Sequence, residues 1–301
     1  MAKISEKAVQ MPASAIRKLV PFADAAKKQG VKVYHLNLGQ PDIKSPVCAL
    51  DAVRNYSLEN VSYSHSAGLM ELRKGLVEKY YRKIGIDLTV DELIVTVAGS
   101  ESVNLALEIT CNPGDEVIVL EPFYTNYNTF AFMNGLTLKA IPTDIRNGFQ
   151  IPPIEEFEKA ITDKTKAILV CNPGNPTGTQ YSKESMLALG EIARKHDLFL
   201  LSDEVYREFC YTDEPHFSAM NIPGLEQNVV LIDSVSKRYN LCGARVGCIV
   251  SHNKDVMTAA MKFAQARLCP PVLGQMAAIG ALDTPDEYFE AVKEEYIKRR
   301  D

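Results

Sequence analysis

Residues 166–203 read KAILVCNPGNPTGTQYSKESMLALGEIARKHDLFLLSD, and this stretch decides the fold class. An apolar run at 166–172 is followed by a loop rich in Asn, Pro and Gly, and a second apolar run occupies 198–203. Between the two runs, residues 183–196 have the spacing of an amphipathic helix, and Ser182 before them is a typical N-cap. The pattern predicts a strand, a helix and a second strand of a mostly parallel sheet.

The same alternation continues on both sides of this unit. Several of the runs are apolar nearly throughout, which is typical of strands that are covered on both faces. We therefore predict an α/β fold in which a mostly parallel sheet is flanked by helices. The further strand candidates are 33–38, 92–98, 116–121, 137–142, 229–234 and 247–251, and the further helix candidates are 14–29, 69–85, 100–111 and 284–301.

Size and composition exclude several classes of protein. The chain has 301 residues, enough for one large domain or two ordinary ones, and a formal net charge of −5. The acidic balance argues against a nucleic-acid binder, and no run approaches the roughly 18 apolar residues of a membrane span. We expect a cytoplasmic protein that has neither nucleic acid nor membrane as a partner. The seven cysteines form no CxxC pair, so we expect reduced, mostly buried thiols and no metal site.

Polar residues follow several of the predicted strands, and in open α/β sheets ligands bind beyond the carboxyl ends of the strands. Ser100 follows Gly99 where a helix begins, which suits either a phosphate site or an ordinary turn. Asn175 lies in the rigid loop NPGNPTG, where its amide can point inward as a donor. Asp203 ends a very apolar strand, so it either needs a cationic or strong donor partner or is a solvated loop acid.

Two cations follow the strand at 229–234. Lys237 is either an ordinary surface lysine or a desolvated amine that is able to form a Schiff base. Arg245 lies between glycines that permit close approach, which suits bidentate phosphate binding. One ligand, pyridoxal phosphate, has groups for all of these residues. It offers an aldehyde for Lys237, a ring nitrogen for Asp203, a ring hydroxyl for Asn175 and Tyr206, and a phosphate for Ser100, Ser236 and Arg245.

Seven motifs carry a resemblance to a known family. They are LGQPD (38–42), YSHSAGLMELR (63–73), VAGSES (97–102), EPFYTNY (121–127), NPGNPTG (172–178), SDEVYREF (202–209) and SVSKRYNLCGARVG (234–247). In this order and spacing they resemble the class I/II aminotransferases, the pyridoxal-phosphate enzymes of fold type I that include aspartate aminotransferase. The resemblance implies an enzyme that moves an amino group between an L-amino acid and a 2-oxo acid through a Schiff base on Lys237.

The resemblance also implies a role for each matching residue. Lys237, Asp203 and Tyr206 would be catalytic: Lys237 would move the substrate proton, and Asp203 would keep the ring nitrogen protonated. Gly39 and Asn175 would contact the substrate, and Tyr63 would reach the phosphate of a neighbouring subunit, which implies a homodimer with shared active sites. The remaining cofactor contacts implied are Ser100, Glu101, Tyr124, Asn175, Tyr206, Ser234, Ser236 and Arg245.

The two ends of the chain differ from its middle. We expect residues 1–45 to form an N-terminal arm and small-domain segment, and residues 46–285 to form the large cofactor-binding domain. Residues 286–301 resemble the start of a helix that leads into a small domain, and we expect the rest of that domain, with its carboxylate-binding arginine, to be missing. Arg267 could face a substrate carboxylate or a partner subunit, but a surface cation is the simpler interpretation.

Three other functions compete with aminotransfer. A carbon–sulfur lyase of the same fold would use the same cofactor site, because fold and cofactor do not fix the reaction. A truncated, inactive product that still binds the cofactor is the second. A dehydrogenase of the Rossmann type is disfavoured, since residues 98–102, AGSES, do not match GxGxxG. The sequence does not identify the substrate amino acid.

Overall fold

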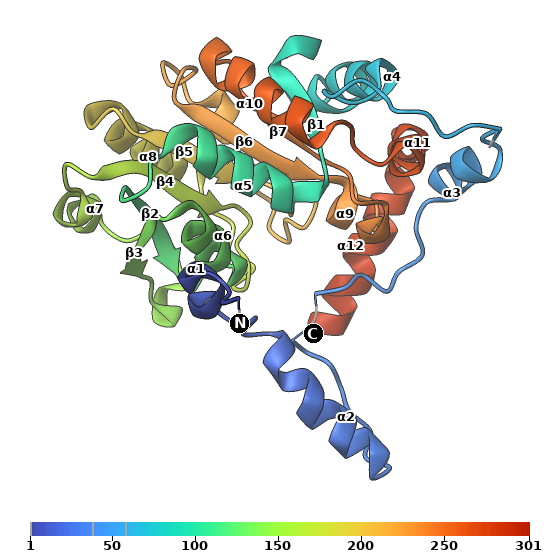
Figure 1. The fold of residues 1–301 in the computed structure, drawn as a ribbon, viewed down its shortest axis with the longest axis horizontal. Coiled ribbons are helices and arrows are strands. Elements are labelled where there is room, and N and C mark those ends of the chain that lie inside the picture. Colours follow the sequence, from blue (N-terminus) through green and yellow to red (C-terminus); the bar gives the residue numbers. More distant parts are fainter. Residues whose placement is uncertain (1, 38, 58) are drawn as a thin grey trace.

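The computed structural model describes residues 2–37, 39–57 and 59–301, and they are organised around one mixed sheet (Figure 1). The strands are β1 (Leu93–Thr96), β2 (Glu116–Glu121), β3 (Thr137–Pro142), β4 (Thr165–Cys171), β5 (Phe199–Asp203), β6 (Val229–Ser234) and β7 (Gly247–Val250). Their order across the sheet is β1-β7-β6-β5-β4-β2-β3. β7 runs antiparallel to both of its neighbours, and the other adjacent strands are parallel.

Helices pack on both faces of this sheet. The helices of the described residues are α1 (Glu6–Gln10), α2 (Val20–Lys28), α3 (Val47–Arg54), α4 (Met70–Gly75), α5 (Ala98–Thr110), α6 (Asn126–Asn134), α7 (Ile154–Ala160), α8 (Lys183–Lys195), α9 (Val235–Arg238), α10 (Lys254–Arg267), α11 (Val272–Ala281) and α12 (Asp286–Arg300). A π-helical stretch, Leu76–Tyr81, continues α4. The predicted α/β class is confirmed.

Two hydrophobic cores explain why the central strands are apolar throughout. Along β6, Val229 and Leu231 enter one core, whereas Val230 and Ile232 enter the other. The first core collects side chains from α4, α8 and α11, and the second from α5, α6 and α10. Successive strand residues point to opposite faces, so a strand that is covered on both sides must be apolar at every position.

Most predicted elements form, and one does not. Ser182 caps α8 by accepting a hydrogen bond from the backbone N–H of Ser185 at 3.2 Å, as predicted. The predicted strand at 33–38 is wrong: its described residues, 33–37, join no strand, and Leu38 lies outside the described residues. Leu36 is 96 % exposed. An alternating pattern makes a strand only where a neighbouring strand offers hydrogen-bond partners.

The cysteine prediction is correct in part. All seven thiols are free. Only Cys111 and Cys248 are buried, whereas the other five are partly exposed, so the expectation of mostly buried thiols is wrong. Among the described residues, no set of three His, Cys, Asp or Glu side chains is arranged to hold a metal ion. The same residues contain no helix that is long and apolar enough to cross a membrane.

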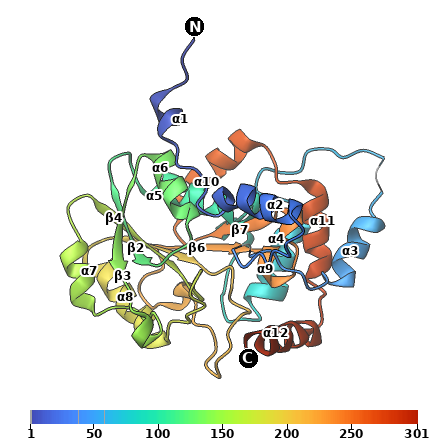
Figure 2. The same cartoon turned by 90° about the horizontal axis from the view of Figure 1, so that it is seen from below.

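The N-terminal segment projects from the body of the molecule. α2 extends away from the sheet in Figure 1, and the chain before α1 stands clear of the body in Figure 2. α2 buries none of its residues, and Phe22 within it is 74 % exposed. Lys7 of α1 donates a hydrogen bond to the backbone carbonyl of Met133 in α6 at 2.5 Å. The segment then returns to the body near residue 37, where Asn37 lines the cavity described below.

Gly247 brings three elements together at the carboxyl end of the central strands. A Cβ atom at this position would lie 2.6 Å from the backbone carbon of Ala98 and 2.7 Å from both the carbonyl oxygen of Asp233 and the nitrogen of Gly99. These distances are too short for any side chain. The absence of a side chain therefore allows β7 to pack directly against the end of β6 and the start of α5.

Candidate active site

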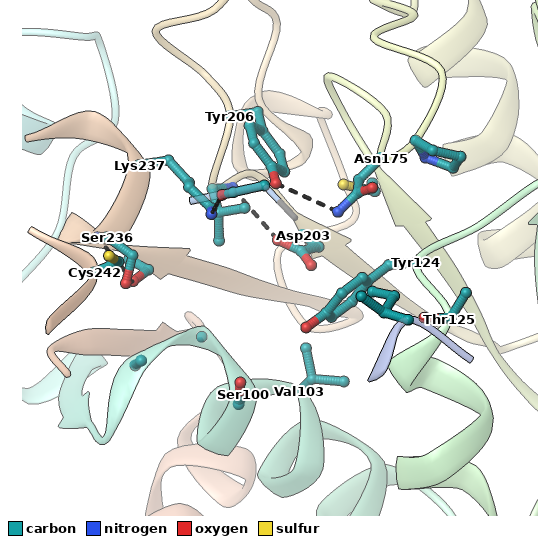
Figure 3. A pocket seen from close by; sticks show the side chains of 18 of the residues that line it. Ser100, Val103, Tyr124, Thr125, Asn175, Asp203, Tyr206, Ser236, Lys237 and Cys242 are labelled. Atoms are coloured by element: carbon teal, nitrogen blue, oxygen red, sulfur yellow. Dashed lines mark hydrogen bonds between the residues drawn. The ribbon is translucent and has the colours of Figure 1, made fainter. Parts of the chain in front are cut away.

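A cavity of about 600 Å³ opens at the carboxyl ends of β4, β5 and β6, beside the N-terminus of α5 (Figure 3). Ten of the predicted site residues line it: Gly39, Ser100, Tyr124, Asn175, Asp203, Tyr206, Ser234, Ser236, Lys237 and Arg245. Lys237, Tyr206, Asn175 and Asp203 gather on one side of the space, with Ser100 and Val103 opposite (Figure 3). The sheet brings them together because parallel strands end at the same edge.

Lys237 lies on the short helix α9, directly after β6. Ser234 caps this helix by accepting a hydrogen bond from the backbone N–H of Ser236 at 3.1 Å. The Nζ atom of Lys237 donates to the carbonyl oxygen of Gly39 at 2.5 Å. Partial burial lowers the pKa of Lys237, and nearby Arg245 lowers it further. A lowered pKa increases the share of the neutral amine, the form that attacks a carbonyl carbon.

Asp203 ends β5 and is only 5 % exposed, which excludes a solvated loop acid. Burial raises its pKa from 3.8 to about 6, because the low dielectric of the interior penalises the charged form. The hydroxyl of Tyr127 donates to Oδ2 of Asp203 at 2.6 Å and partly offsets that rise. The cavity therefore contains a buried acid that a cationic partner would stabilise.

Asn175 and Tyr206 meet on the same side of the cavity, although they come from two different loops. The Nδ2 atom of Asn175 donates to the hydroxyl oxygen of Tyr206 at 3.3 Å (Figure 3). Burial raises the pKa of Tyr206, so its phenol is protonated at neutral pH. A phenol O–H and an amide N–H side by side form a pair of donors for an oxygen atom.

The opposite end of the cavity is suited to an anion. α5 begins there, and the first backbone N–H groups of a helix have no partner within it. The hydroxyls of Ser234 and Ser236 lie 2.8 Å apart beside them. Arg245 is exposed, with Nη1 donating to the carbonyl oxygen of Cys242 at 3.1 Å. Hydroxyls, a helix N-terminus and a guanidinium are the groups that bind phosphate in proteins.

Two residues that line the cavity have unusual backbone angles. Ala98 has a φ of +63° and Arg245 a φ of +54°, although neither is glycine. Non-glycine residues in the left-handed region are uncommon and cluster at functional sites. The hydroxyl of Thr96 donates to the carbonyl oxygen of Ala98 at 3.1 Å and supports that turn.

Two predicted site residues do not line the cavity in this chain. Tyr63 is 80 % exposed on the loop before α4. The carboxylate of Glu101 accepts a hydrogen bond from the backbone N–H of Val97 and lies 3.0 Å from Nε of Arg267. The simpler interpretation of Arg267 as a surface cation is therefore wrong. Its side chain is 17 % exposed and also donates to the backbone carbonyl of Ser66 at 3.1 Å.

The sequence interpretation missed other residues at the site. Val205 lines the cavity two positions after Asp203, and Ile16 reaches it from the N-terminal segment. Tyr127 does not line the cavity but donates a hydrogen bond to Asp203. Tyr127 follows Tyr124 by three positions, but Tyr124 precedes α6, so helical spacing does not relate the two side chains. No local signal marks Ile16, because its place depends on how a distant segment packs.

Comparison with known proteins identifies the family. Residues 31–301 match the model of the family described as aminotransferase class I and II. A putative aminotransferase of Bacillus subtilis is 35% identical over 99% of this chain and 76% of its own length. The aspartate/prephenate aminotransferase of Thermus thermophilus is 32% identical over 100% of this chain and 78% of its own length.

Solved structures of aminotransferases are also similar to this chain. A double mutant of Thermus thermophilus aspartate aminotransferase superposes with a TM-score of 0.93 at 32% identity, covering 100% of this chain and 78% of that one. An alanine aminotransferase from Pyrococcus furiosus gives 0.91 at 33% identity, covering 99% and 77%. The chain belongs to the class I and II aminotransferases. It is an aminotransferase, as predicted; these relatives are named for that activity, and nothing in the comparisons favours the lyase.

The buried carboxyl of Asp203 should destabilise the cofactor-free chain. Its pKa is higher in the folded chain than its ordinary value of 3.8, so the folded state holds the extra proton between about pH 4 and pH 6. Stability therefore falls as the pH rises through this window and stays lower above it. The rise to about 6 corresponds to about 3 kcal/mol at neutral pH.

Asp203→Asn removes this ionisation, so the cofactor-free variant should be more stable than the wild type at pH 8. The difference should shrink as the pH falls from 6 to 4. Chemical denaturation across this range measures it. Asp213→Asn, at an exposed carboxyl on the loop after β5, is the control and should leave stability nearly unchanged. A difference for Asp203→Asn that does not vary with pH would contradict the argument.

Proposed function

We propose that this chain binds pyridoxal phosphate in the cavity and uses it to move an amino group between an L-amino acid and a 2-oxo acid. One observation carries the proposal: a half-buried amine, a buried acid, a pair of neutral donors and an anion-binding end face one space. These four groups are complementary to the aldehyde, ring nitrogen, ring hydroxyl and phosphate of a single molecule. The class I and II aminotransferases are pyridoxal-phosphate enzymes, which supports the choice of cofactor.

Different residues would bind the different groups of pyridoxal phosphate. Ser100, Ser236 and Arg245 would bind its phosphate, together with Ser234 and the free N–H groups of α5, including that of Glu101. Asp203 would bind the ring nitrogen, and Asn175 with Tyr206 would bind the ring oxygen. Tyr124 and Val205 would contact the ring itself. Each polar assignment pairs a donor with an acceptor or a charge with its opposite.

When bound, pyridoxal phosphate supplies an aldehyde for the substrate amine and a protonated ring that accepts the electron pair left by the Cα proton. Lys237 would first bind the aldehyde carbon through Nζ and, once the substrate amine replaces it, accept the Cα proton as a neutral amine. The lowered pKa of Lys237 favours that neutral form. Asp203 would keep the ring nitrogen protonated, and the carbonyl of Gly39, 2.5 Å from Nζ, would guide the lysine beside the substrate.

We further propose a homodimer with shared active sites. Support comes from Tyr63, which is exposed but held on a fixed loop: the buried Gln275 accepts from the backbone N–H of Leu69 at 2.7 Å and donates to Ser64 Oγ at 3.1 Å. A rigid, exposed tyrosine is suited to entering the cavity of a second copy.

Seven free thiols support a cytoplasmic location. Residues 46–285, which contain the sheet, remain our proposed large domain.

Adding pyridoxal phosphate to the purified chain tests the proposal. The chain should acquire the visible absorbance of a lysine-bound cofactor, and the same sample should scatter light with the mass of two chains. Adding an L-amino acid should then convert the absorbance to that of the aminated cofactor and release a 2-oxo acid. No visible band with a molar equivalent of cofactor would contradict cofactor binding. Release of pyruvate and ammonia from a cysteine conjugate, without amination, would contradict aminotransfer.

A further inference from the structure

Tyr127 lies directly behind the cavity without lining it. It belongs to α6, is 1 % exposed, and donates its hydroxyl hydrogen to Oδ2 of Asp203 at 2.6 Å. Its ring also packs edge-to-face against Tyr124, with centroids 5.4 Å apart and planes at 87°. A single buried side chain therefore touches two of the residues that face the cavity, one acidic and one aromatic.

We propose that Tyr127 is a positioning residue, which fixes the carboxylate of Asp203 so that it can bind a protonated ring nitrogen in the cavity. This inference rests on the proposed function, because it requires a ligand that has such a nitrogen. Tyr127 itself would touch neither cofactor nor substrate. It acts through Asp203 and, by packing, through Tyr124.

The hydrogen bonds of Asp203 support this role. The terminal torsion of an aspartate side chain is broad, so a carboxylate needs a fixed donor to hold one orientation. Tyr127 provides that donor at Oδ2, whereas Oδ1 has only a long contact of 3.4 Å from the backbone N–H of Val205. Each carboxylate oxygen accepts about two hydrogen bonds, so capacity remains for a donor inside the cavity.

The charges around Asp203 make the hydroxyl of Tyr127 more important. The titratable groups that face Asp203 are Tyr124 and Tyr127, Cys171 of β4, Glu204 and Tyr206 after β5, and Asp233 of β6. Asp233 and Glu204 raise the pKa of Asp203, as burial does, and the hydrogen bond from Tyr127 lowers it. Among the described side chains, Tyr127 is the one within hydrogen-bond distance that donates to this carboxylate. It thus favours the charged form, which binds a protonated nitrogen.

The test compares two ligands that differ in one atom. Tyr127→Phe removes the hydroxyl and keeps the ring. Both the wild type and the variant are titrated with pyridoxal phosphate and with an analogue that has carbon in place of the ring nitrogen, and binding is followed by absorbance. We expect Tyr127→Phe to weaken binding of pyridoxal phosphate about tenfold, the effect of one pKa unit, and binding of the analogue less than twofold.

Tyr81→Phe is a matched control. Tyr81 is also buried and donates to an aspartate, Asp233, at 2.8 Å, but it does not line the cavity. Tyr81→Phe should weaken the binding of the two ligands equally, or leave both unchanged. If Tyr127→Phe fails to fold, Tyr127→His, which keeps a donor on α6, should retain the wild-type preference for pyridoxal phosphate over the analogue.

Equal losses for the two ligands in Tyr127→Phe, or no loss for either, would overturn the inference, as would loss of the preference in Tyr127→His. The proposed function fails separately. In that case the wild type itself would bind neither ligand, or would bind pyridoxal phosphate without the visible absorbance of a lysine-bound cofactor.

Discussion

Lys237→Ala should lower kcat for aminotransfer by about 10⁴-fold, the upper end of the effect of a positioned acid–base group. The lysine is the half-buried amine at the cavity, its pKa is lowered, and Nζ lies 2.5 Å from the carbonyl oxygen of Gly39. Alanine cannot bind the aldehyde or move the Cα proton. Stopped-flow absorbance with pyridoxal phosphate and an amino acid measures the rate, and the visible band of the lysine-bound cofactor should be absent.

Two further variants separate the amine from the charge of Lys237. Lys237→Arg keeps a positive charge, but a guanidinium is never neutral in proteins, so this variant should be as inactive as alanine. Lys164→Ala, at an exposed lysine before β4 and at the opposite end of the strands, should retain wild-type kcat. A Lys237→Ala chain that still forms the visible band would show that another lysine holds the cofactor.

Arg238→Ala should cause the largest loss of stability, about 3–5 kcal/mol in the free energy of unfolding. The Nη2 atom of Arg238 lies 2.7 Å and 2.6 Å from the two carboxylate oxygens of Asp233, and Nε lies 2.9 Å from Glu208. Its guanidinium carbon is 3.6 Å from the ring centroid of Tyr80. Removing the side chain leaves the fully buried Asp233 without its closest cation.

Urea denaturation measures this loss. Arg146→Ala is the control: Arg146 is also paired with an aspartate, Asp144, but its side chain is exposed, so little change is expected. The pKa of Asp233 is lowered, chiefly by Arg238, against the effect of burial. The stabilisation by the pair is therefore present above 3.8, the ordinary pKa of Asp, and is lost as the pH falls below it. Equal effects of Arg238→Ala and Arg146→Ala would contradict the argument.

The strands and the residues at their ends could be predicted from the sequence. Apolar runs locate buried strands, and parallel strands of one sheet end at the same edge, so Asn175, Asp203 and Lys237 were expected to lie close together. The structure places all three around one cavity. The prediction succeeded because it needed only local patterns and one general rule of sheet geometry.

Contacts between distant segments could not be predicted in this way. Arg267 binds Glu101, more than a hundred residues earlier in the chain, and charge alone does not specify a partner. Tyr127 of α6 bonds Asp203, which lies 76 residues later in the chain, and no local pattern encodes this contact. The run at 33–38 alternates like a strand, yet pairing depends on the rest of the sheet.

The order of the central strands has a consequence for how this chain can vary in length. β4, β5 and β6 are direct neighbours, about 4.8 Å apart. Asp203 ends β5, and Asn175 and Lys237 follow β4 and β6 by a few residues. Backbone hydrogen bonds between these strands therefore fix the distances between the three side chains. Insertions in the turns that enter these strands, such as 223–228, leave the spacing of the three side chains intact. An insertion within a strand would displace one of the three side chains relative to the other two. We therefore expect evolutionary changes in length to occur in the turns before these strands.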